Sequence, residues 1–542
     1  MACILSSSGG SSGGDSRVTV GNSSPGNSGS GESKTVDGNN NPRRPAGKLF
    51  TWGRGSHGQL GQDAYRHPRE NSALPHPVPG MVSVVQVACG GGQQGCTGAV
   101  DASGVLWTWG NNYGGRLGLL DTNHRASPER VVRLPGPVAA VAFGTSHGAC
   151  VTVSGACLTW GADRRGCLGR AVVDGAAEGG ALVPGPVTRQ ESDGAVGAAA
   201  GWAAVDAEHE YTAGITYTGA LWIWGANEHG KLGLGDMRDR ATPARIRLRI
   251  GDKEDEERVA LVRLGSIYAA AVTTSGRLYM WGWGGHGNLG VGRRVKSQRT
   301  PQHVFLGGLG DRFVVDVGCT RGQPAFKGGV GAVKSGGTEG PHTVIVTADG
   351  ELFTCGTCHK GLGLNLGNKT GAFGKPWDEL SPYHVGVDPV RNSHDKRPMA
   401  PYGAAGSSVA QTVAPSPPRL CVWPPPYDVV KPFVQCVSAH IHSAVVDAEG
   451  RAWAWGCGSN DGRAGVERFL NMAGEGKPPK VDGLKCYMMN PHRVGVARPK
   501  YWGGGPSLMG MRVIQLATGR NHMACIAIPR TSMAEEMTMP KN

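Results

Sequence analysis

One run of residues in the chain, Cys355-Gly356-Thr357-Cys358-His359, has the spacing of a haem-attachment motif. In a C-x-x-C-H run the two thiols bond to the haem and the histidine binds its iron. Here Cys355 and Gly356 stand in the place of a Trp-Gly pair that recurs along the chain, and no second Cys or His pair at metal-ligand spacing accompanies them. We therefore expect a structural turn here, with neither a metal nor a cofactor.

A second run, Pro424-Pro425-Pro426-Tyr427, has the composition of a polyproline ligand for aromatic grooves of the WW type. Such a ligand is already extended, so little conformational entropy is lost when it binds. The same run could instead be a stiff spacer that Trp423 and Val429 pack onto the rest of the protein. The sequence leaves both interpretations open.

The end of the chain is basic, although the formal net charge of the whole chain is only +13. No acidic residue occurs between Gly483 and Ala534. Cations and aromatic rings alternate there, which is the combination that single-strand RNA binders use. The alternative is a basic loop that meets an acidic protein. The residues predicted to bind in this segment are Arg493, Arg498, Lys500, Tyr501 and Trp502.

The sequence contains no recognisable catalytic motif. His147, His442 and His522 occur at the same place in three similar segments, which predicts a repeated structural hydrogen bond. No G-x-x-x-x-G-K-[ST] phosphate loop occurs. We therefore expect no covalent catalysis, and any activity would be regulation of a small GTPase.

These candidate residues must be positioned by a repeated unit, a Gly followed by apolar residues, an aromatic residue and another Gly. It occurs seven times, beginning at Gly47, Gly104, Gly155, Gly219, Gly276, Gly350 and Gly450. The aromatic residue fills space between neighbouring units, and the Gly after it permits a turn. The structural positions that we predict are Trp52-Gly53, Trp109-Gly110, Trp160-Gly161, Trp224-Gly225, Trp281-Gly282 and Trp455-Gly456.

A second unit alternates with the first and consists of two short apolar strands joined by a turn. Its seven copies begin near Val82, Val138, Val196, Val259, Val314, Val434 and Val513. The alternation is typical of strands, and sheets arranged radially cover one another's faces. We predict an all-β, seven-bladed β-propeller. Because the chain opens with the first unit and closes with the second, a composite blade from both termini should close the ring.

The residues from Leu221 to Gly233 resemble the repeat of the regulator of chromosome condensation family, as do Leu106 to Gly118, Phe50 to Gly61 and Tyr279 to Gly290. The resemblance extends from about Gly47 to Ile528, apart from insertions. It implies the same seven-bladed propeller.

The predicted layout is a propeller between two tails. Residues 1–46 are rich in Ser, Gly and Asn and are expected to be disordered, residues 47–530 form the propeller, and residues 531–542 are a C-terminal tail. Insertions are expected near 171–194, 320–342, 368–432 and 467–510. The sequence shows no membrane span and no secretory signal, and its 14 Cys are expected to be reduced. We predict an intracellular protein, cytoplasmic or nuclear, with a mitochondrial location left open.

The resemblance also bears on function, because the founding member of the family is a nuclear, chromatin-bound exchange factor for a small GTPase. That activity is associated with an acidic residue in one of the Gly turns. The seven turns are predicted at Gly92-Gln93-Gln94, Thr145-Ser146-His147, Gly201-Trp202-Ala203, Ser266-Ile267-Tyr268, Cys319-Thr320-Arg321, Ala439-His440-Ile441-His442 and Arg520-Asn521-His522.

None of these predicted turns carries an acidic residue. We therefore predict a monomeric, non-catalytic scaffold that binds protein or nucleoprotein partners through one face and through its basic and Pro-rich insertions. Guanine-nucleotide exchange on a small GTPase is the alternative.

Overall fold

A computed structural model gives the conformation of the chain. It describes residues 45–62, 71–172, 181–189, 201–249, 256–292, 295–306, 309–322, 341–357, 378–385, 432–440, 442–457, 487–493, 508 and 510–530. All the strands lie in one compact unit, which begins at Ala46.

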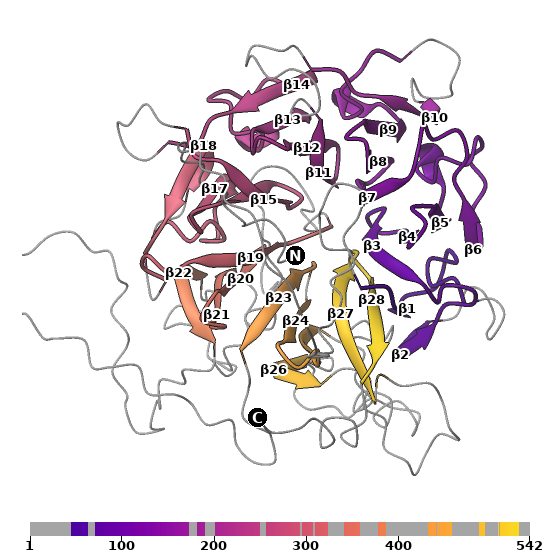
Figure 1. Ribbon diagram of the computed structural model, residues 1–542. Coiled ribbons are helices and arrows are strands. Elements are labelled where there is room, and N and C mark those ends of the chain that lie inside the picture. Colours follow the sequence, from indigo (N-terminus) through magenta and orange to yellow (C-terminus); the bar gives the residue numbers. More distant parts are fainter. Residues whose placement is uncertain are drawn as a thin grey trace, which may run out of the picture. The chain divides into compact units, whose positions relative to one another are not determined.

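The described residues form 28 strands in seven antiparallel sheets of four, arranged around a common centre (Figure 1). The predicted seven-bladed propeller is confirmed.

Six blades are each built from four consecutive strands. Blade 1 contains β3 (Val84–Gly90), β4 (Cys96–Asp101), β5 (Leu106–Gly110) and β6 (Arg125–Arg130). Blade 2 contains β7 (Val138–Phe143), β8 (His147–Thr152), β9 (Cys157–Gly161) and β10 (Ala181–Pro186). Blade 3 contains β11 (Trp202–Glu208), β12 (Tyr211–Thr216), β13 (Leu221–Gly225) and β14 (Arg240–Ile246).

The next three blades follow the same order. Blade 4 contains β15 (Val259–Leu264), β16 (Tyr268–Thr273), β17 (Leu278–Gly284) and β18 (Val295–Val304). Blade 5 contains β19 (Val314–Cys319), β20 (His342–Thr347), β21 (Leu352–Thr357) and β22 (Asp378–Val385). Blade 6 contains β23 (Phe433–Ser438), β24 (His442–Asp447), β25 (Ala452–Cys457) and β26 (Tyr487–Arg493).

Blade 7 is composite. It joins β27 (Met511–Thr518) and β28 (His522–Pro529) to β1 (Lys48–Gly53) and β2 (Ser72–Pro77). In Figure 1 the yellow strands β27 and β28 therefore stand beside the indigo strands β1 and β2. Strand β1 pairs with β28 along its full length, from Lys48 opposite Ala527 to Gly53 opposite His522. This pairing removes two open sheet edges.

The first strands of neighbouring blades contact one another around the centre of the ring. Glutamine side chains fasten several of these contacts by bonding both backbone groups of one residue in the next blade. Gln515 Nε2 donates to Val87 O (3.2 Å) and Gln515 Oε1 accepts from Val87 N (3.1 Å). Gln435 makes the same pair with Leu516, so blade 7 is fastened to both of its neighbours.

The repeated tryptophans fill the wedges between blades. Trp52, Trp109, Trp160, Trp224, Trp281 and Trp455 have no exposed surface. Four indole N–H groups donate to a carbonyl oxygen in the preceding blade, at 2.7–3.0 Å: Trp109 to Gln59, Trp160 to Arg116, Trp224 to Cys167 and Trp281 to Lys231.

In blade 5 the buried Cys355 takes the tryptophan's place, with its Sγ 3.6 Å from Asn288 O. Cys355 is therefore part of the packing between blades. Cys358 and His359 lie outside the described residues.

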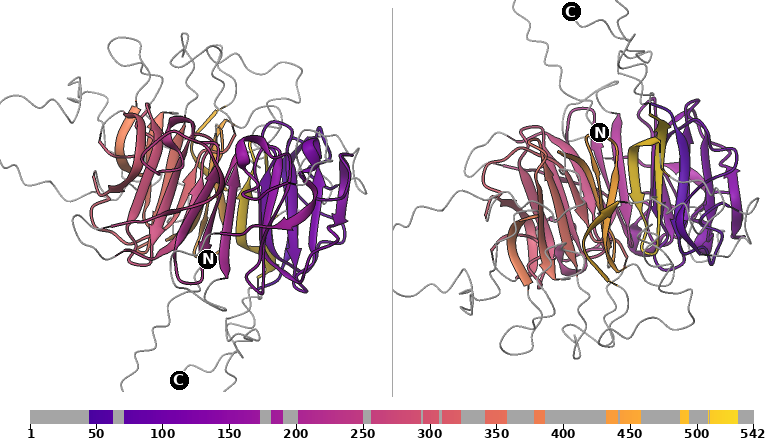
Figure 2. Two further views of the ribbon diagram at one scale, coloured as in Figure 1. Left: turned by 90° about the horizontal axis from the view of Figure 1, so that it is seen from above. Right: turned by 90° about the horizontal axis from the view of Figure 1, so that it is seen from below.

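Because successive strands are antiparallel, their connections alternate between two faces of the ring, which Figure 2 shows from the side. The network face is formed by the turns between first and second strands and the loops between third and fourth strands, such as residues 209–210 and 226–239. It includes the short 3₁₀ helices η1 (Tyr113–Gly115), η2 (Arg164–Gly166) and η5 (Glu228–Gly230). The linker face is formed by the turns between second and third strands and the linkers between blades, such as residues 217–220 and 256–258.

No helix among the described residues is long and apolar enough to cross a membrane.

Candidate functional site

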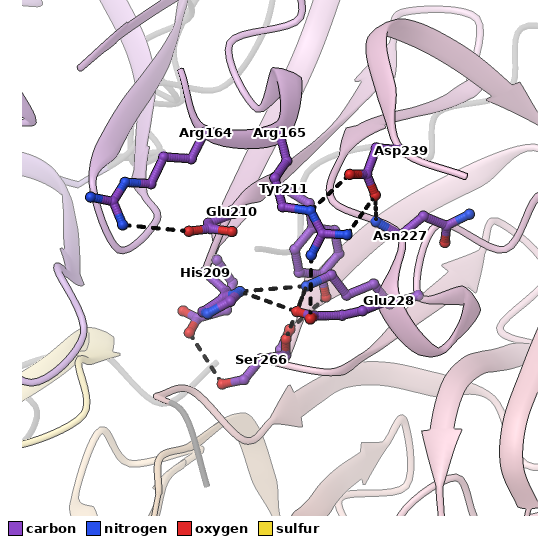
Figure 3. A network of polar contacts seen from close by, with 12 residues as sticks. Arg164, Arg165, His209, Glu210, Tyr211, Asn227, Glu228, Asp239 and Ser266 are labelled. Carbon is purple, nitrogen blue, oxygen red and sulfur yellow. Dashed lines mark hydrogen bonds and ion pairs between the residues drawn. The ribbon is translucent and has the colours of Figure 1, made fainter. Parts of the chain in front are cut away.

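A network of charged side chains joins blades 2 and 3 on the network face (Figure 3). Arg165 of η2 forms two parallel bonds to Asp239, from Nε to Oδ2 (2.7 Å) and from Nη2 to Oδ1 (2.9 Å). Its Nη1 lies 3.3 Å from Glu228 Oε2 of η5. These three side chains are between 35% and 38% exposed. Charges held in place at the surface in this way are available to a partner.

The neighbouring arginine contacts the turn between β11 and β12. Arg164 Nη1 lies 3.9 Å from Glu210 Oε1, and Arg164 Nη2 donates to Tyr113 Oη at 2.6 Å. The Arg164 guanidinium also lies 5.5 Å from the centroid of the Tyr113 ring. Loops of blades 1, 2 and 3 therefore meet at this arginine.

A buried cation supports the network from beneath. Lys231 is wholly buried, and its Nζ donates to Glu228 Oε1 at 2.9 Å and lies 4.7 Å from the centroid of the Tyr211 ring. Burial lowers the pKa of Lys231. Burial alone would raise the pKa of Glu228, but Lys231 lowers it to about 2. The carboxylate of Glu228 therefore stays charged and fixed.

His209 lies beside this pair, with its Nδ1 3.5 Å from Lys231 Nζ. Burial, aided by the charge of Lys231, lowers the pKa of His209 to about 4. His209 is therefore neutral at physiological pH.

A second ion-pair group lies at the centre of the same face. Arg321 follows β19 and pairs with Asp206 of β11, and its Nη1 lies 3.8 Å from Glu208 Oε2. Gly322 N donates to Glu208 Oε1 at 3.0 Å. Blades 3 and 5 are not neighbours, so Arg321 joins two blades that blade 4 separates. Burial raises the pKa of Glu208, against the opposing effect of Arg321.

Three non-glycine residues at this site adopt left-handed backbone conformations: Arg165 (φ 56°), His209 (φ 48°) and His229 (φ 60°). In blade 1, Gly114 (φ 66°) takes the position that Arg165 and His229 take in blades 2 and 3. Side chains in this conformation cost about 1 kcal/mol or more and cluster at functional sites. The face is therefore strained where its ion pairs meet.

The predicted position of the turn in blade 3 was wrong. Gly201-Trp202-Ala203 does not form the turn between first and second strands, because β11 begins at Trp202, which packs between blades. The turn follows Glu208 and contains His209 and Glu210. This turn is acidic, contrary to the expectation that no such turn carries an acidic residue.

The repeated histidines make the hydrogen bond expected for them. His147 Nε2 lies 2.8 Å from Thr212 Oγ1, His522 Nε2 lies 3.0 Å from Thr97 Oγ1, and His442 Nε2 lies 3.3 Å from Thr518 Oγ1, each in the next blade. A fourth, His342, contacts Ser443 Oγ at 2.8 Å in the same way. The sequence analysis did not identify His342 because the residues between Arg321 and His342 separate it from β19, the preceding strand of the blade.

Most of the binding residues predicted from sequence lie outside the described residues: Pro424, Pro425, Pro426, Tyr427, Arg498, Lys500, Tyr501 and Trp502. Arg493 ends β26, opposite Trp453. Arg130 and Arg245 take the same register position, opposite Trp107 and Trp222. None of the predicted binding residues belongs to the described network.

Comparison with known families agrees with the repeat pattern and the ring. Four segments, residues 46–95, 103–151, 218–272 and 275–322, match the Regulator of chromosome condensation (RCC1) repeat. These four segments of the chain are RCC1 repeats. The matched segments lie in blades 7, 1, 2, 3, 4 and 5.

Curated relatives of this RCC1 repeat protein include two from Arabidopsis thaliana. It is 30% identical over 276 residues to the Ultraviolet-B receptor UVR8, and this alignment covers 50% of this chain and 56% of UVR8. It is 30% identical over 275 residues to RCC1 domain-containing protein RUG3, mitochondrial, with the same coverage of 50% and 56%. The chain therefore spans about half the length of these relatives.

Among solved structures, Prp20p from Saccharomyces cerevisiae superimposes with a TM-score of 0.60 at 17% identity, covering 91% of this chain and 95% of Prp20p. At this identity the likeness shows the fold alone.

Proposed function

We propose that this RCC1 repeat protein is a non-catalytic propeller that binds a protein partner through its network face. The observation that carries the proposal is the pairing of Arg165 with Asp239 and Glu228, which joins two blades at half-exposed positions. Prearranged surface charges favour complementary partners and speed their encounter. A strained arginine held by two carboxylates is also suited to exchanging those carboxylates for ones on a partner.

Protein binding by this fold has a precedent in Prp20p, whose structure was described together with its binding properties to Gsp1p and histones. The precedent supports the class of partner, a protein, and does not identify it.

Affinity capture with a charge-swapped variant tests the proposal. The tagged chain, Arg165→Glu and the double variant Arg165→Glu/Asp239→Arg would each be used to capture proteins from the cells of origin at moderate salt. The double variant keeps the ion pair but reverses both charges at the surface, so loss of the partner from both variants supports recognition of those charges. A partner retained by both variants would place the binding surface elsewhere.

Treatment of the same samples with nuclease separates protein partners from nucleoprotein ones. RNA contact through Arg498, Lys500 and Trp502 stays a prediction. A partner lost after nuclease would support that contact and argue against direct protein binding by the network face.

Nucleotide exchange on a small GTPase is a second candidate, favoured by the acidic turn of blade 3. The family resemblance associates exchange with an acidic residue in such a turn, and Glu208 and Glu210 both flank His209. Glu208 is buried and bonded to Gly322 N, whereas Glu210 is partly exposed. Glu210 is therefore the residue that could reach a GTPase.

Release of a fluorescent GDP from a panel of small GTPases tests exchange. Acceleration by the chain that is lost in Glu210→Gln, with the thermal stability of the protein unchanged, would support it. Unchanged release from every GTPase that the chain captures in its nucleotide-free form would reject it and leave protein binding intact.

We propose an intracellular location, in the cytoplasm, the nucleus or, as the name of RUG3 states for that relative, the mitochondrion. Microscopy of the chain tagged at its C-terminus tests which compartment holds it.

A further inference from the structure

Three blades place a tryptophan one residue into the third strand, where it lies toward the linker face. In two of them the indole N–H donates to an aspartate that ends the second strand of the same blade. Trp107 Nε1 donates to Asp101 Oδ2 at 3.0 Å in blade 1, and Trp453 Nε1 donates to Asp447 Oδ2 at 3.0 Å in blade 6. These pairs show what the position requires, namely a carboxylate oxygen beside the indole.

Blade 3 has the tryptophan but not the aspartate. Its second strand ends at Thr216, the position that Asp101 and Asp447 take in blades 1 and 6. The Thr216 hydroxyl replaces one carboxylate oxygen, because its Oγ1 accepts from Ala220 N (3.1 Å) as Asp101 Oδ1 accepts from Val105 N (3.0 Å). The second carboxylate oxygen has no counterpart in threonine.

The indole of Trp222 is consequently left without its acceptor. Trp222 is 4% exposed, and its buried Nε1 has no hydrogen-bond partner among the residues that the structure describes. A buried donor without an acceptor costs about 1–3 kcal/mol, so such groups are rare in folded proteins.

A pocket of about 220 Å³ is present at this place, lined by Thr216, Thr218, Trp222, Arg258 and Glu257 among others. The Arg189 guanidinium lies over the Trp222 ring, 5.8 Å from its centroid. The acidic residues of the lining are paired with arginines, since Glu256 Oε2 lies 2.8 Å from Arg245 Nη2 and Glu257 pairs with Arg277. The lining thus carries three arginines, Arg189, Arg245 and Arg258, against two glutamates that are already paired.

We propose that this pocket binds a carboxylate from outside the blade, with one oxygen accepting from Trp222 Nε1. The bound oxygen takes the place that Asp101 Oδ2 and Asp447 Oδ2 occupy beside their tryptophans. In blade 6 the same aspartate oxygen also accepts from Arg451 Nε at 2.7 Å, so the template combines an indole and a guanidinium on one carboxylate. The site is on the linker face, away from the network face, and does not depend on the function proposed above.

The carboxylate could come from a small acid, from an acidic side chain of a protein or from a protein's C-terminus. Acetate, the capped residue Ac-Glu-NH₂ and the peptide Ac-Gly-Gly with a free C-terminus represent the three sources. Ac-Gln-NH₂ and amidated Ac-Gly-Gly are matched controls that lack the charge.

Indole ¹H–¹⁵N signals of the ¹⁵N-labelled full chain provide the readout, with the Trp222 signal assigned by its loss in Trp222→Phe. We expect the carboxylate probes to shift this signal downfield and saturably, while the signals of Trp107 and Trp453 stay in place. In Thr216→Asp the Trp222 signal should be shifted before any probe is added and should no longer respond. In Trp222→Phe the affinity measured by calorimetry should fall by about tenfold or more, the effect expected for losing a hydrogen bond to a charged group.

The proposal would be overturned if the Trp222 indole signal did not shift with any of the three carboxylate probes. It would also be overturned if the signal shifted equally with the uncharged controls. Affinity for a probe that is unchanged in both Thr216→Asp and Trp222→Phe would also overturn it. Thermal unfolding of each variant shows whether it is folded, and Thr216→Asp keeps the test valid should Trp222→Phe fail to fold.

Discussion

The two faces of the propeller share one backbone plan but differ in side-chain chemistry. On the network face, ion pairs run between blades and reach buried groups such as Lys231 and Arg321. Most of the large apolar side chains that are exposed among the described residues lie on the linker face: Val82, Val132, Val153, Tyr217, Phe305, Leu306, Phe313 and Val434. A ring of similar blades thus presents two separate surfaces, and each can change without disturbing the other.

Acidification should produce the largest difference between the faces, because buried histidines lie at the network face and the pKa of three of them is lowered. Burial lowers the pKa of His147 to about 3 and that of His522 to about 4, and burial with Lys231 lowers that of His209 to about 4. Between pH 6.5 and 5 the unfolded chain takes up these protons while the folded chain does not, so stability falls with pH.

Each histidine should contribute about 2 kcal/mol of this loss over that interval. Urea unfolding at pH 7.5, 6 and 5 measures it, with His147→Gln as the control that should lose the part of the pH dependence that His147 contributes. A stability that does not change between pH 6.5 and 5 would contradict the assignment of neutral, buried histidines.

Removing the cation that joins blades 3 and 5 should have the next largest effect. Arg321→Ala leaves Asp206 and Glu208 buried without their cation, which should lower the free energy of unfolding by about 3–5 kcal/mol. The matched linker-face variant is Arg258→Ala, where an exposed guanidinium donates to Thr218 O. Its effect should stay within about 0.5 kcal/mol. If urea unfolding showed the same decrease in the free energy of unfolding for both variants, the proposed difference between the two faces would be wrong.

The strain at Arg165 should be visible as a smaller effect. Both Arg165→Gly and Arg165→Ala remove the ion pairs with Asp239 and Glu228, but only glycine accepts φ 56° without cost. We expect the glycine variant to be more stable than the alanine variant by about 1 kcal/mol, as measured by thermal unfolding. The opposite order would show that the backbone relaxes when the side chain is removed.

Polar substitution of exposed apolar residues should have the smallest effect. Phe305 and Val82 are 50% and 64% exposed, so Phe305→Ser/Val82→Ser should change the free energy of unfolding by no more than about 1 kcal/mol. Capture of the network-face partner should also be unchanged. Loss of that partner in this double variant would move its binding site to the linker face.

The ring itself could be predicted from the sequence because each blade contains a recognisable sequence unit within a short stretch of the chain. The seven Gly–aromatic–Gly units and the split unit at the ends gave the number of blades and the composite blade 7. Blade 3 was misaligned because its turn, at His209 and Glu210, contains no glycine, since His209 adopts the positive φ itself. Gly201 and Trp202, eight residues earlier, matched the expected turn better by residue type.

The candidate site was not predictable in the same way. Arg165 and Asp239 are 74 positions apart and Arg321 and Asp206 are 115 apart. Charges at such separations meet only when specific blades close around the ring, and no local pattern reports it. The missing carboxylate beside Trp222 follows from the structural equivalence of Thr216 with Asp101 and Asp447, which the sequence alone does not align.

The pairing of β1 with β28 also has a consequence for synthesis on the ribosome. Phe50 pairs with Cys525, so β1 cannot form this pairing until β28, the last of the described strands, has been synthesised. At 5–20 residues per second, that delay is roughly 25 to 95 seconds. During this time β1 has only β2 as a partner in its sheet, and an edge strand in that condition is prone to pair with other chains. The nascent protein therefore depends on protection of its earliest strand until the ring can close.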